Sequence, residues 1–223
     1  MCASQKVRTL LSPPGNMTFE PKNIIMFGKT GAGKSLLGGV LLNDYKQFPV
    51  SSNTFSATKE TSNVVNPIEN CKIFDTKGFL DTQDEINAHK EGGSPQTLLK
   101  NALDTVGCIA EEGVHAILLV IKLDRISQAE VELAKKTLLR VFGYECREKF
   151  LLVITNCEDN LVDYPKEGEK WLAENVENTG SNFKNYFALV NENPKKVIFV
   201  NNKNLDTVSY SVVKVVYPKY SKH

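Results

Sequence analysis

The segment from Gly28 to Ser35 constrains the fold of this 223-residue chain more than any other. It reads Gly-Lys-Thr-Gly-Ala-Gly-Lys-Ser and fits the pattern G-x-x-x-x-G-K-[ST] at every defined position. An apolar segment at 23–27 precedes it, and apolar residues at helical spacing follow it over 35–42. A strand, a glycine-rich loop and a helix in this order predict a phosphate-binding loop in an α/β fold.

The residue types in this loop suit a bound nucleotide triphosphate. Glycines let the backbone curl so that N–H groups point inward, and the following helix adds the positive end of its dipole. Lys34 would reach the β- and γ-phosphates, and the Ser35 hydroxyl would ligate Mg²⁺. The residues that we expect to bind the nucleotide here are Gly28, Lys29, Thr30, Gly31, Ala32, Gly33, Lys34, Ser35 and Leu36.

A second motif, Asp75-Thr-Lys-Gly78, follows an apolar segment at the spacing of a D-x-x-G sequence. In such a motif Asp75 would hold Mg²⁺ through a water molecule, and the Gly78 N–H would contact the γ-phosphate. The next residue is Phe79, which cannot make the hydrogen bond by which a glutamine orients the attacking water in many GTPases. We therefore expect slow hydrolysis unless another group supplies this function.

A third motif, Asn156-Cys-Glu-Asp159, follows the predicted strand at 150–154. A carboxylate here can accept hydrogen bonds from both N1–H and the exocyclic amine of guanine, a donor pair that adenine lacks. We assign Asn156 and Asp159 to base binding, together with Asn201 and Asn202 at the end of the last predicted strand. An ATP-dependent kinase or ATPase would use the phosphate loop alone, and Asp159 disfavours that alternative.

The remaining pattern predicts one α/β domain with tails. We expect a flexible N-terminal tail at 1–21, the domain at 22–205, and a C-terminal segment of uncertain structure at 206–223. The predicted strands are 23–27, 61–66, 71–74, 114–121, 150–154 and 197–200, with the second and third forming a hairpin. The predicted helices are 35–42, 94–110 and 127–142, with one or two more within 165–190.

Composition and charge exclude several classes of protein. Lys and Arg number 27 and Asp and Glu 26, so the net charge of +1 does not suit a protein that binds nucleic acid phosphates. The longest apolar run, 116–121, is far too short for a transmembrane segment. Five cysteines without a Cys-x-x-Cys pair indicate a reducing compartment. We expect a cytoplasmic protein, peripheral to membranes if the native chain is longer.

From Asn23 to Lys203 the sequence resembles GTPases of the immunity-associated type (GIMAP), which group with plant avirulence-induced proteins and are related to septins and chloroplast import receptors. The resemblance is carried by the phosphate loop, by Asp75 to Asp81 and by Asn156 to Leu161. The segment Gly113 to Arg125 is similar to the family's own box, which ordinary small GTPases lack. The resemblance implies a Ras-like P-loop G domain, with a mostly parallel central sheet and helices on both faces. It also implies GTP/GDP and Mg²⁺ as ligands, nucleotide-dependent homodimers and slow hydrolysis.

Two catalytic assignments follow from this resemblance. Thr58 lies in a segment similar to the family's first switch and would close on Mg²⁺ in the GTP state. Arg125 follows the family box, where it would reach the nucleotide of a partner subunit and supply what Phe79 cannot. A solvated or ion-paired role for Arg125 is the alternative. A GTP-loaded scaffold with negligible hydrolysis is the corresponding alternative function.

Two positions depart from the family pattern. Lys77 stands where the family usually has proline, and Cys157 stands where most guanine motifs have lysine, so aliphatic packing beside the nucleotide is lost. His115 lies within the family box, and we interpret it as a core histidine rather than a functional one.

Overall fold

The computed structural model describes residues 22–29, 31–42, 62–66, 71–76, 107, 113–123, 128–157, 166–178 and 182–200. Its strands are β1 (Lys22–Phe27), β2 (Ser62–Asn66), β3 (Cys71–Asp75), β4 (Ala116–Lys122), β5 (Phe150–Thr155) and β6 (Val197–Phe199). Its α-helices are α2 (Lys34–Leu42), α5 (Gln128–Phe142), α6 (Lys166–Glu177) and α7 (Phe183–Leu189). Two short 3₁₀ helices are η1 (Glu145–Lys149) and η2 (Pro194–Lys196).

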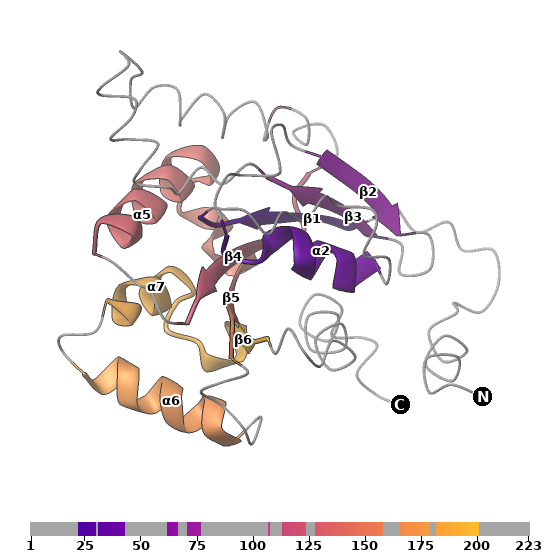
Figure 1. The fold of residues 1–223 in the computed structure, drawn as a ribbon. Coiled ribbons are helices and arrows are strands. Elements are labelled where there is room, and N and C mark those ends of the chain that lie inside the picture. The colour runs from indigo at the N-terminus through magenta and orange to yellow at the C-terminus, as the bar shows by residue number, and fades with distance from the viewer. Residues whose placement is uncertain are drawn as a thin grey trace, which may run out of the picture.

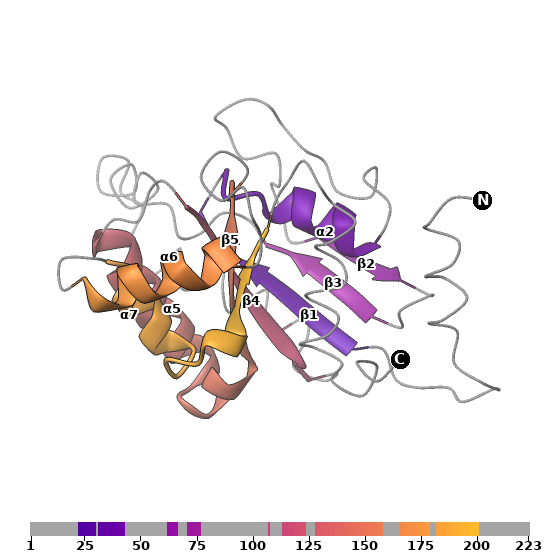
Figure 2. The same cartoon turned by 90° about the horizontal axis from the view of Figure 1, so that it is seen from below.

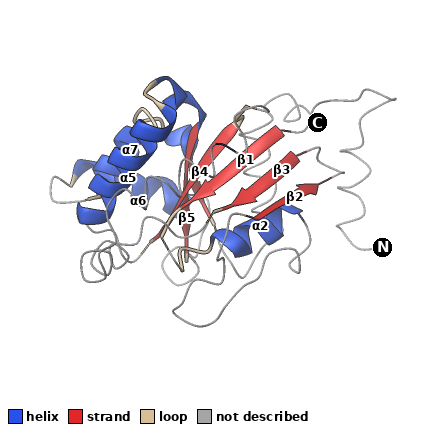
Figure 3. Cartoon of the chain, turned by 90° about the horizontal axis from the view of Figure 1, so that it is seen from above, coloured by secondary structure: helices blue, strands red, loops and turns tan. Residues whose placement is uncertain are grey.

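The strands form one sheet in the order β2-β3-β1-β4-β5-β6 (Figure 3). All neighbouring pairs are parallel except β2 and β3, which are antiparallel. Met26 is paired with Asp75, and Lys122 with Thr155, so the carboxyl ends of β1, β3, β4 and β5 meet at one edge. In open α/β sheets this edge is where ligands bind.

Helices cover both faces of the sheet, as the sequence predicts (Figures 1 and 2). Alternate residues of β1 point to opposite faces. Ile24 and Met26 belong to the core under α2, whereas Ile25 and Phe27 belong to the core shared with α5, α6 and α7. Among the helices that the structure describes, none is long and apolar enough to cross a membrane.

The predicted elements that fall on described residues agree with the structure within a few residues. The hairpin of β2 and β3 is confirmed, and the 165–190 segment contains two helices. Helix α5 ends at Phe142, just before Gly143 as predicted, and the Gly143 N–H donates to the Leu139 carbonyl at 3.1 Å. Strand β4 begins at Ala116 rather than 114, and the Gly113 carbonyl that precedes it accepts a hydrogen bond from the Asn23 side chain at 2.8 Å. The tail at 1–21, the predicted helix at 94–110 apart from residue 107, and the segment 206–223 lie outside the described residues.

Aromatic side chains pack α6 against β6, the outermost strand on this side of the sheet. The Trp171 ring lies 4.9 Å from Phe183 of α7 and 5.6 Å from Phe199 of β6, both edge-on. A Cβ atom at Gly168 would come within 3.1 Å of the Phe199 ring. Helix α6 therefore approaches β6 as closely as a residue without a side chain permits.

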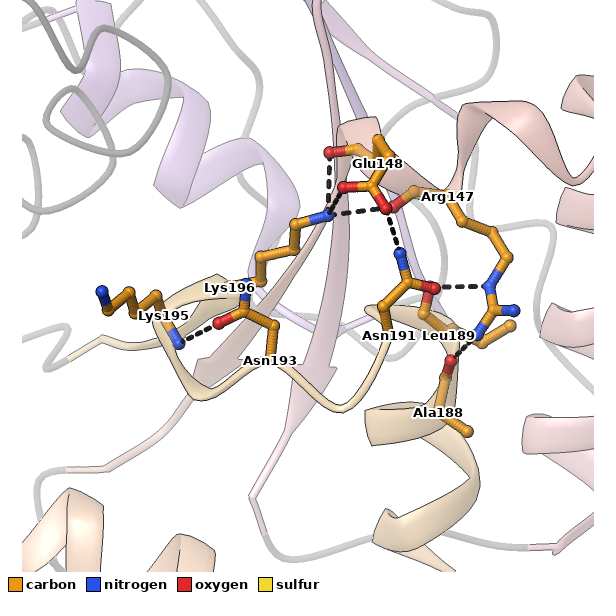
Figure 4. Close-up of polar contacts among 8 residues, drawn as sticks. All are labelled: Arg147, Glu148, Ala188, Leu189, Asn191, Asn193, Lys195 and Lys196. Carbon is orange, nitrogen blue, oxygen red and sulfur yellow. Dashed lines mark hydrogen bonds and ion pairs between the residues drawn. The ribbon is translucent and has the colours of Figure 1, made fainter.

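A polar network joins η1 to the turn between α7 and η2 (Figure 4). Arg147 donates to the Ala188 carbonyl near the end of α7. The ammonium of Lys196 lies 2.9 Å from both the backbone oxygen and the carboxylate of Glu148, which also accepts from Asn191. The hydrogen bond and charge of Lys196 lower the pKa of the Glu148 carboxyl. This network holds β6 in place beside β5 from the end of the sheet opposite the phosphate loop.

Candidate functional site

The loop from Gly28 to Ser35 leaves β1 at the edge where the parallel strands end and enters α2 (Figure 1). The Ala32 N–H donates to the Lys29 carbonyl at 3.1 Å and closes a turn. The Leu37 N–H donates to the Gly33 carbonyl at 2.9 Å, which is the first hydrogen bond of the helix. Gly33 has φ +89°, a conformation that side-chain-bearing residues rarely adopt. The local backbone therefore requires glycine here before any ligand is considered.

Gly28 has a different reason to lack a side chain. A Cβ atom at this position would lie 2.2 Å from the Val120 carbonyl oxygen of β4. Contacts below 3.0 Å essentially never occur, so the two backbones would have to separate. The first glycine of the motif is thus required by strand packing, whereas the sequence alone suggested only the curling of the loop around phosphates.

The side chain of Lys34 folds back over the loop. It is 6% exposed, and its ammonium donates to the carbonyls of Gly28 and Lys29, each at 3.0 Å. A buried ammonium needs such acceptors because it has lost most of its hydration. Phosphate oxygens are stronger partners for this charge than neutral carbonyls. The positive charge is therefore already held at the loop that would surround a phosphate.

Ser35 and Asp75 meet across the start of α2 and the end of β3. The Ser35 hydroxyl donates to Asp75 Oδ2 at 2.6 Å, and Asp75 is fully buried. An aliphatic hydroxyl and a carboxylate are the oxygen donors that Mg²⁺ uses beside a nucleotide. Two of the three residues predicted to bind the metal are thus brought together, and their chemistry fits the ion.

Two buried threonines, which the motifs alone do not indicate, hydrogen-bond to the backbone around the site. The Thr76 hydroxyl donates to the Met26 carbonyl of β1 at 2.7 Å. The Thr155 hydroxyl lies 2.8 Å from the Ala32 carbonyl, within the phosphate loop. Each threonine directly ends or follows a buried strand beside a motif, which is the sequence signal that would have drawn attention to it.

The segment predicted to bind guanine begins where β5 and β6 end side by side. The Val200 N–H donates to the Ile154 carbonyl at 2.7 Å, and the Cys157 N–H to the Val200 carbonyl at 3.4 Å. Asn156, which directly precedes Cys157, has φ +63°, a backbone conformation that asparagine tolerates better than most residues. Cys157 is fully buried in the core, with its thiol 3.3 Å from the Ile154 carbonyl. The cysteine in place of the usual lysine thus occupies a core position.

Several predicted site residues lie outside the described part of the chain, and their assignments stay predictions. Leu36 and Asn156 are described and half-buried, in the first turn of α2 and after β5 respectively. Residues of the site for which no structure is described are Thr30, Thr58, Gly78, Arg125, Asp159, Asn201 and Asn202. The same holds for Lys77 and Phe79.

His115 lies at the end of the sheet opposite the phosphate loop, just before β4. Its Nδ1 accepts a hydrogen bond from the Asn23 backbone N–H at 3.0 Å, and the His115 backbone N–H donates to the Asn23 carbonyl at 2.9 Å. The ring and the backbone of His115 therefore extend the pairing with β1 by one residue ahead of Ala116, the first residue of β4. This arrangement supports the structural interpretation of His115.

Comparisons with known proteins identify the relatives and the fold of this chain. One relative is the immune-associated nucleotide-binding protein 10 of Arabidopsis thaliana, 32% identical over 162 residues, a match that covers 66% of this chain and 31% of that protein. The chain spans between 31% and 64% of the length of six such plant relatives.

Solved structures show the same fold at low sequence identity. Toc33 of Arabidopsis thaliana in complex with GDP and Mg²⁺ is 16% identical, with a TM-score of 0.62, over 97% of this chain and 93% of that one. A second structure comes from work on the chloroplast translocon components atToc33 and psToc159, for which dimerization is important for the GTPase activity. It is 16% identical to this chain in sequence, with a TM-score of 0.64. That match covers 98% of this chain and 90% of the other. The fold is thus the Ras-like P-loop G domain that the sequence predicts.

The family model of the AIG1 family matches residues 22–210, which is most of the chain and includes all three motifs. The resemblance read from the sequence, to GTPases of the immunity-associated and avirulence-induced type, is therefore confirmed. This chain belongs to the AIG1 family.

Proposed function

We propose that this chain binds GTP and GDP together with Mg²⁺ and acts as a slowly hydrolysing, nucleotide-dependent switch. The observation that carries the proposal is the buried Lys34 ammonium over a glycine loop, beside the Ser35–Asp75 pair at the same strand ends. Membership of the AIG1 family supports it. The plant relatives named as nucleotide-binding proteins, and the Toc33 complex with GDP and Mg²⁺, point in the same direction.

Phosphate binding would use the loop as it stands. Lys34 would exchange its carbonyl partners for β- and γ-phosphate oxygens, and the N–H groups at the start of α2 would complete the cradle. Ser35 would ligate Mg²⁺ directly and Asp75 through water, with Thr58 joining in the GTP state. When bound, the ion neutralises charge on the β- and γ-phosphates. Gly78 would contact the γ-phosphate and so distinguish GTP from GDP.

Base selection is assigned to the segment that follows β5. We propose that Asp159 accepts from N1–H and the exocyclic amine of guanine, with Asn156, Asn201 and Asn202 around the base. The described contacts support this assignment, because the backbone of Cys157 is bonded to Val200 and so the ends of β5 and β6 lie together. Residues 22–205 would form the complete nucleotide-binding domain.

Hydrolysis is proposed to depend on a nucleotide-dependent homodimer. Phe79 leaves the attacking water without its usual side-chain partner, and Arg125 from a second copy would stabilise the transition-state charge. Such an arginine contributes about a thousandfold or more in rate. The chloroplast translocon components, for which dimerization is important for GTPase activity, support the comparison.

The test is the rate of GTP turnover per subunit across a wide range of protein concentration. The proposal expects this specific activity to rise with concentration, since the dimer is the active species. Arg125→Ala should lose the rise while binding nucleotide nearly as well as the parent. Arg140→Ala, on an exposed position of α5, is the matched control and should behave as the parent.

A GTP-loaded scaffold is the second candidate, favoured by Phe79 alone. For such a scaffold we expect tight GTP binding and dimer formation, with negligible GTP turnover at every protein concentration. Sedimentation with a non-hydrolysable GTP analogue separates the two roles of Arg125. A variant that loses dimerisation would show that the arginine holds the dimer together, whereas a variant that still dimerises but has lost turnover supports the catalytic role.

A further inference from the structure

The peptide between Ala32 and Gly33 sits at the centre of the phosphate loop. Its carbonyl oxygen lies 2.8 Å from the Thr155 hydroxyl, 123 residues away in sequence and at the end of β5. In a trans peptide the C=O and N–H bonds point in opposite directions. A carbonyl held toward Thr155 therefore turns the Gly33 N–H away from β5.

Glycine itself does not fix this orientation. Gly33 has φ +89°, and rotating the peptide plane by half a turn would bring φ to about −90°, which glycine adopts as readily. In the part of the chain that the structure describes, the Gly33 N–H has no hydrogen-bond partner. The bond from Thr155 is thus what distinguishes the observed orientation from the flipped one.

The Thr155 hydroxyl has one proton and two acceptors within reach. The Ile121 carbonyl is 3.2 Å away, beyond the usual length for a hydroxyl donor, whereas 2.8 Å to Ala32 is typical. The rest of Thr155 is immobilised: it is 1% exposed, and its carbonyl accepts from the Leu123 N–H at 3.1 Å. Its methyl group would lie 3.5 Å from a Cβ on Gly33, so side chain and loop are in contact.

We propose that Thr155 is a positioning residue for phosphate binding, which holds the Ala32–Gly33 peptide so that the Gly33 N–H faces the β-phosphate. This inference rests on the proposed function, because it assigns a donor within the same phosphate loop. It also gives the base-recognition segment a direct bond to the phosphate loop, because Thr155 immediately precedes Asn156.

The test uses the full chain and Mg²⁺-GDP as the probe. Thr155→Val keeps the shape but places a methyl group against the Ala32 carbonyl, and Thr155→Ser restores the hydroxyl. We expect Thr155→Val to weaken GDP binding about fivefold in calorimetry, as the loss of one buried hydrogen bond implies. The ³¹P resonance of the bound β-phosphate should shift, with the α-phosphate resonance as internal reference. Thr155→Ser should return both readouts to near the parent values.

Asn23→Leu is the matched control, because it also removes one buried bond from a side chain to a carbonyl, 2.8 Å to Gly113, at the opposite end of the sheet. It should lower stability toward urea, followed by Trp171 fluorescence, without changing GDP affinity or the ³¹P spectrum. If Thr155→Val does not fold, Thr155→Ala replaces it as the variant without the hydroxyl, with GDP affinity and the ³¹P spectrum measured in the same way.

Parent-like GDP affinity and ³¹P shifts in the hydroxyl-free variant would overturn the inference, as would failure of Thr155→Ser to restore them. A parent chain that binds no GDP would overturn the proposed function itself, and with it this inference.

Discussion

Replacing Gly28 by alanine should destabilise the domain far more than is usual for one added methyl group in a loop. The added methyl group would lie 2.2 Å from the Val120 carbonyl oxygen and 3.4 Å from the Val120 Cβ. The clashing oxygen belongs to the backbone and cannot rotate away, so β1 and β4 must separate by roughly 1 Å at the end of their ladder. Close packing of the surrounding core opposes such a shift. We expect a loss of about 3 kcal/mol in the free energy of unfolding.

The assay is urea unfolding of the nucleotide-free chain, with Trp171 fluorescence as the readout. With a slope of about 2–3 kcal/mol/M for a domain of this size, the midpoint should fall by about 1 M or more. Gly31→Ala is the matched control in the same loop. Gly31 has φ +79° and no atom within 4 Å of an added Cβ, so only backbone strain of about 1–2 kcal/mol applies. Equal losses in the two variants would refute the steric reasoning.

Three further changes test separate parts of the account. Ser35→Asn should weaken binding of Mg²⁺-GTP more than of GDP, because it removes the hydroxyl beside Asp75; equal titration curves for both nucleotides would contradict the metal assignment. Asp159→Asn should cost about 1–3 kcal/mol of GDP binding in calorimetry, and parent-like affinity would exclude this residue from base recognition. Lys196 lowers the pKa of Glu148 below its ordinary value of 4.5, so the stability that this carboxylate contributes is present above that value and lost as pH falls through the lowered pKa. Glu148→Gln should lack this part of the acid dependence in urea unfolding across pH 2 to 7, and an unchanged pH profile would contradict the assignment.

The sequence predicts most of the described fold because its signals are local. The buried runs that became β1, β4 and β5 lie beside amphipathic segments, and the motifs fall at strand ends, where parallel topology gathers them. The pairing of Ser35 with Asp75 follows from this topology alone. The start of β4 lies two residues later than predicted, because an apolar run does not show where its pairing with β1 begins.

The contacts that the sequence did not predict join residues far apart in the chain. Nothing near Thr155 in sequence indicates that its hydroxyl bonds to Ala32, and nothing near Gly28 indicates the carbonyl of Val120. Both depend on the order and register of strands, which single-residue patterns do not encode. The burial of Cys157 is of the same kind, since its side chain packs in a core formed by residues from several strands and helices.

The most direct test of the central claim is equilibrium competition against a fluorescent GDP analogue bound to the full chain in Mg²⁺. If Lys34 and its loop hold phosphates and the β5–β6 edge selects guanine, unlabelled GTP and GDP should displace the analogue at similar concentrations. ATP should then require at least about 100-fold more, since two guanine donors would be missing. Lys34→Ala should abolish binding, whereas Lys135→Ala, on the exposed side of α5, should not. Displacement by ATP as effective as by GTP, or unchanged binding in Lys34→Ala, would contradict the account.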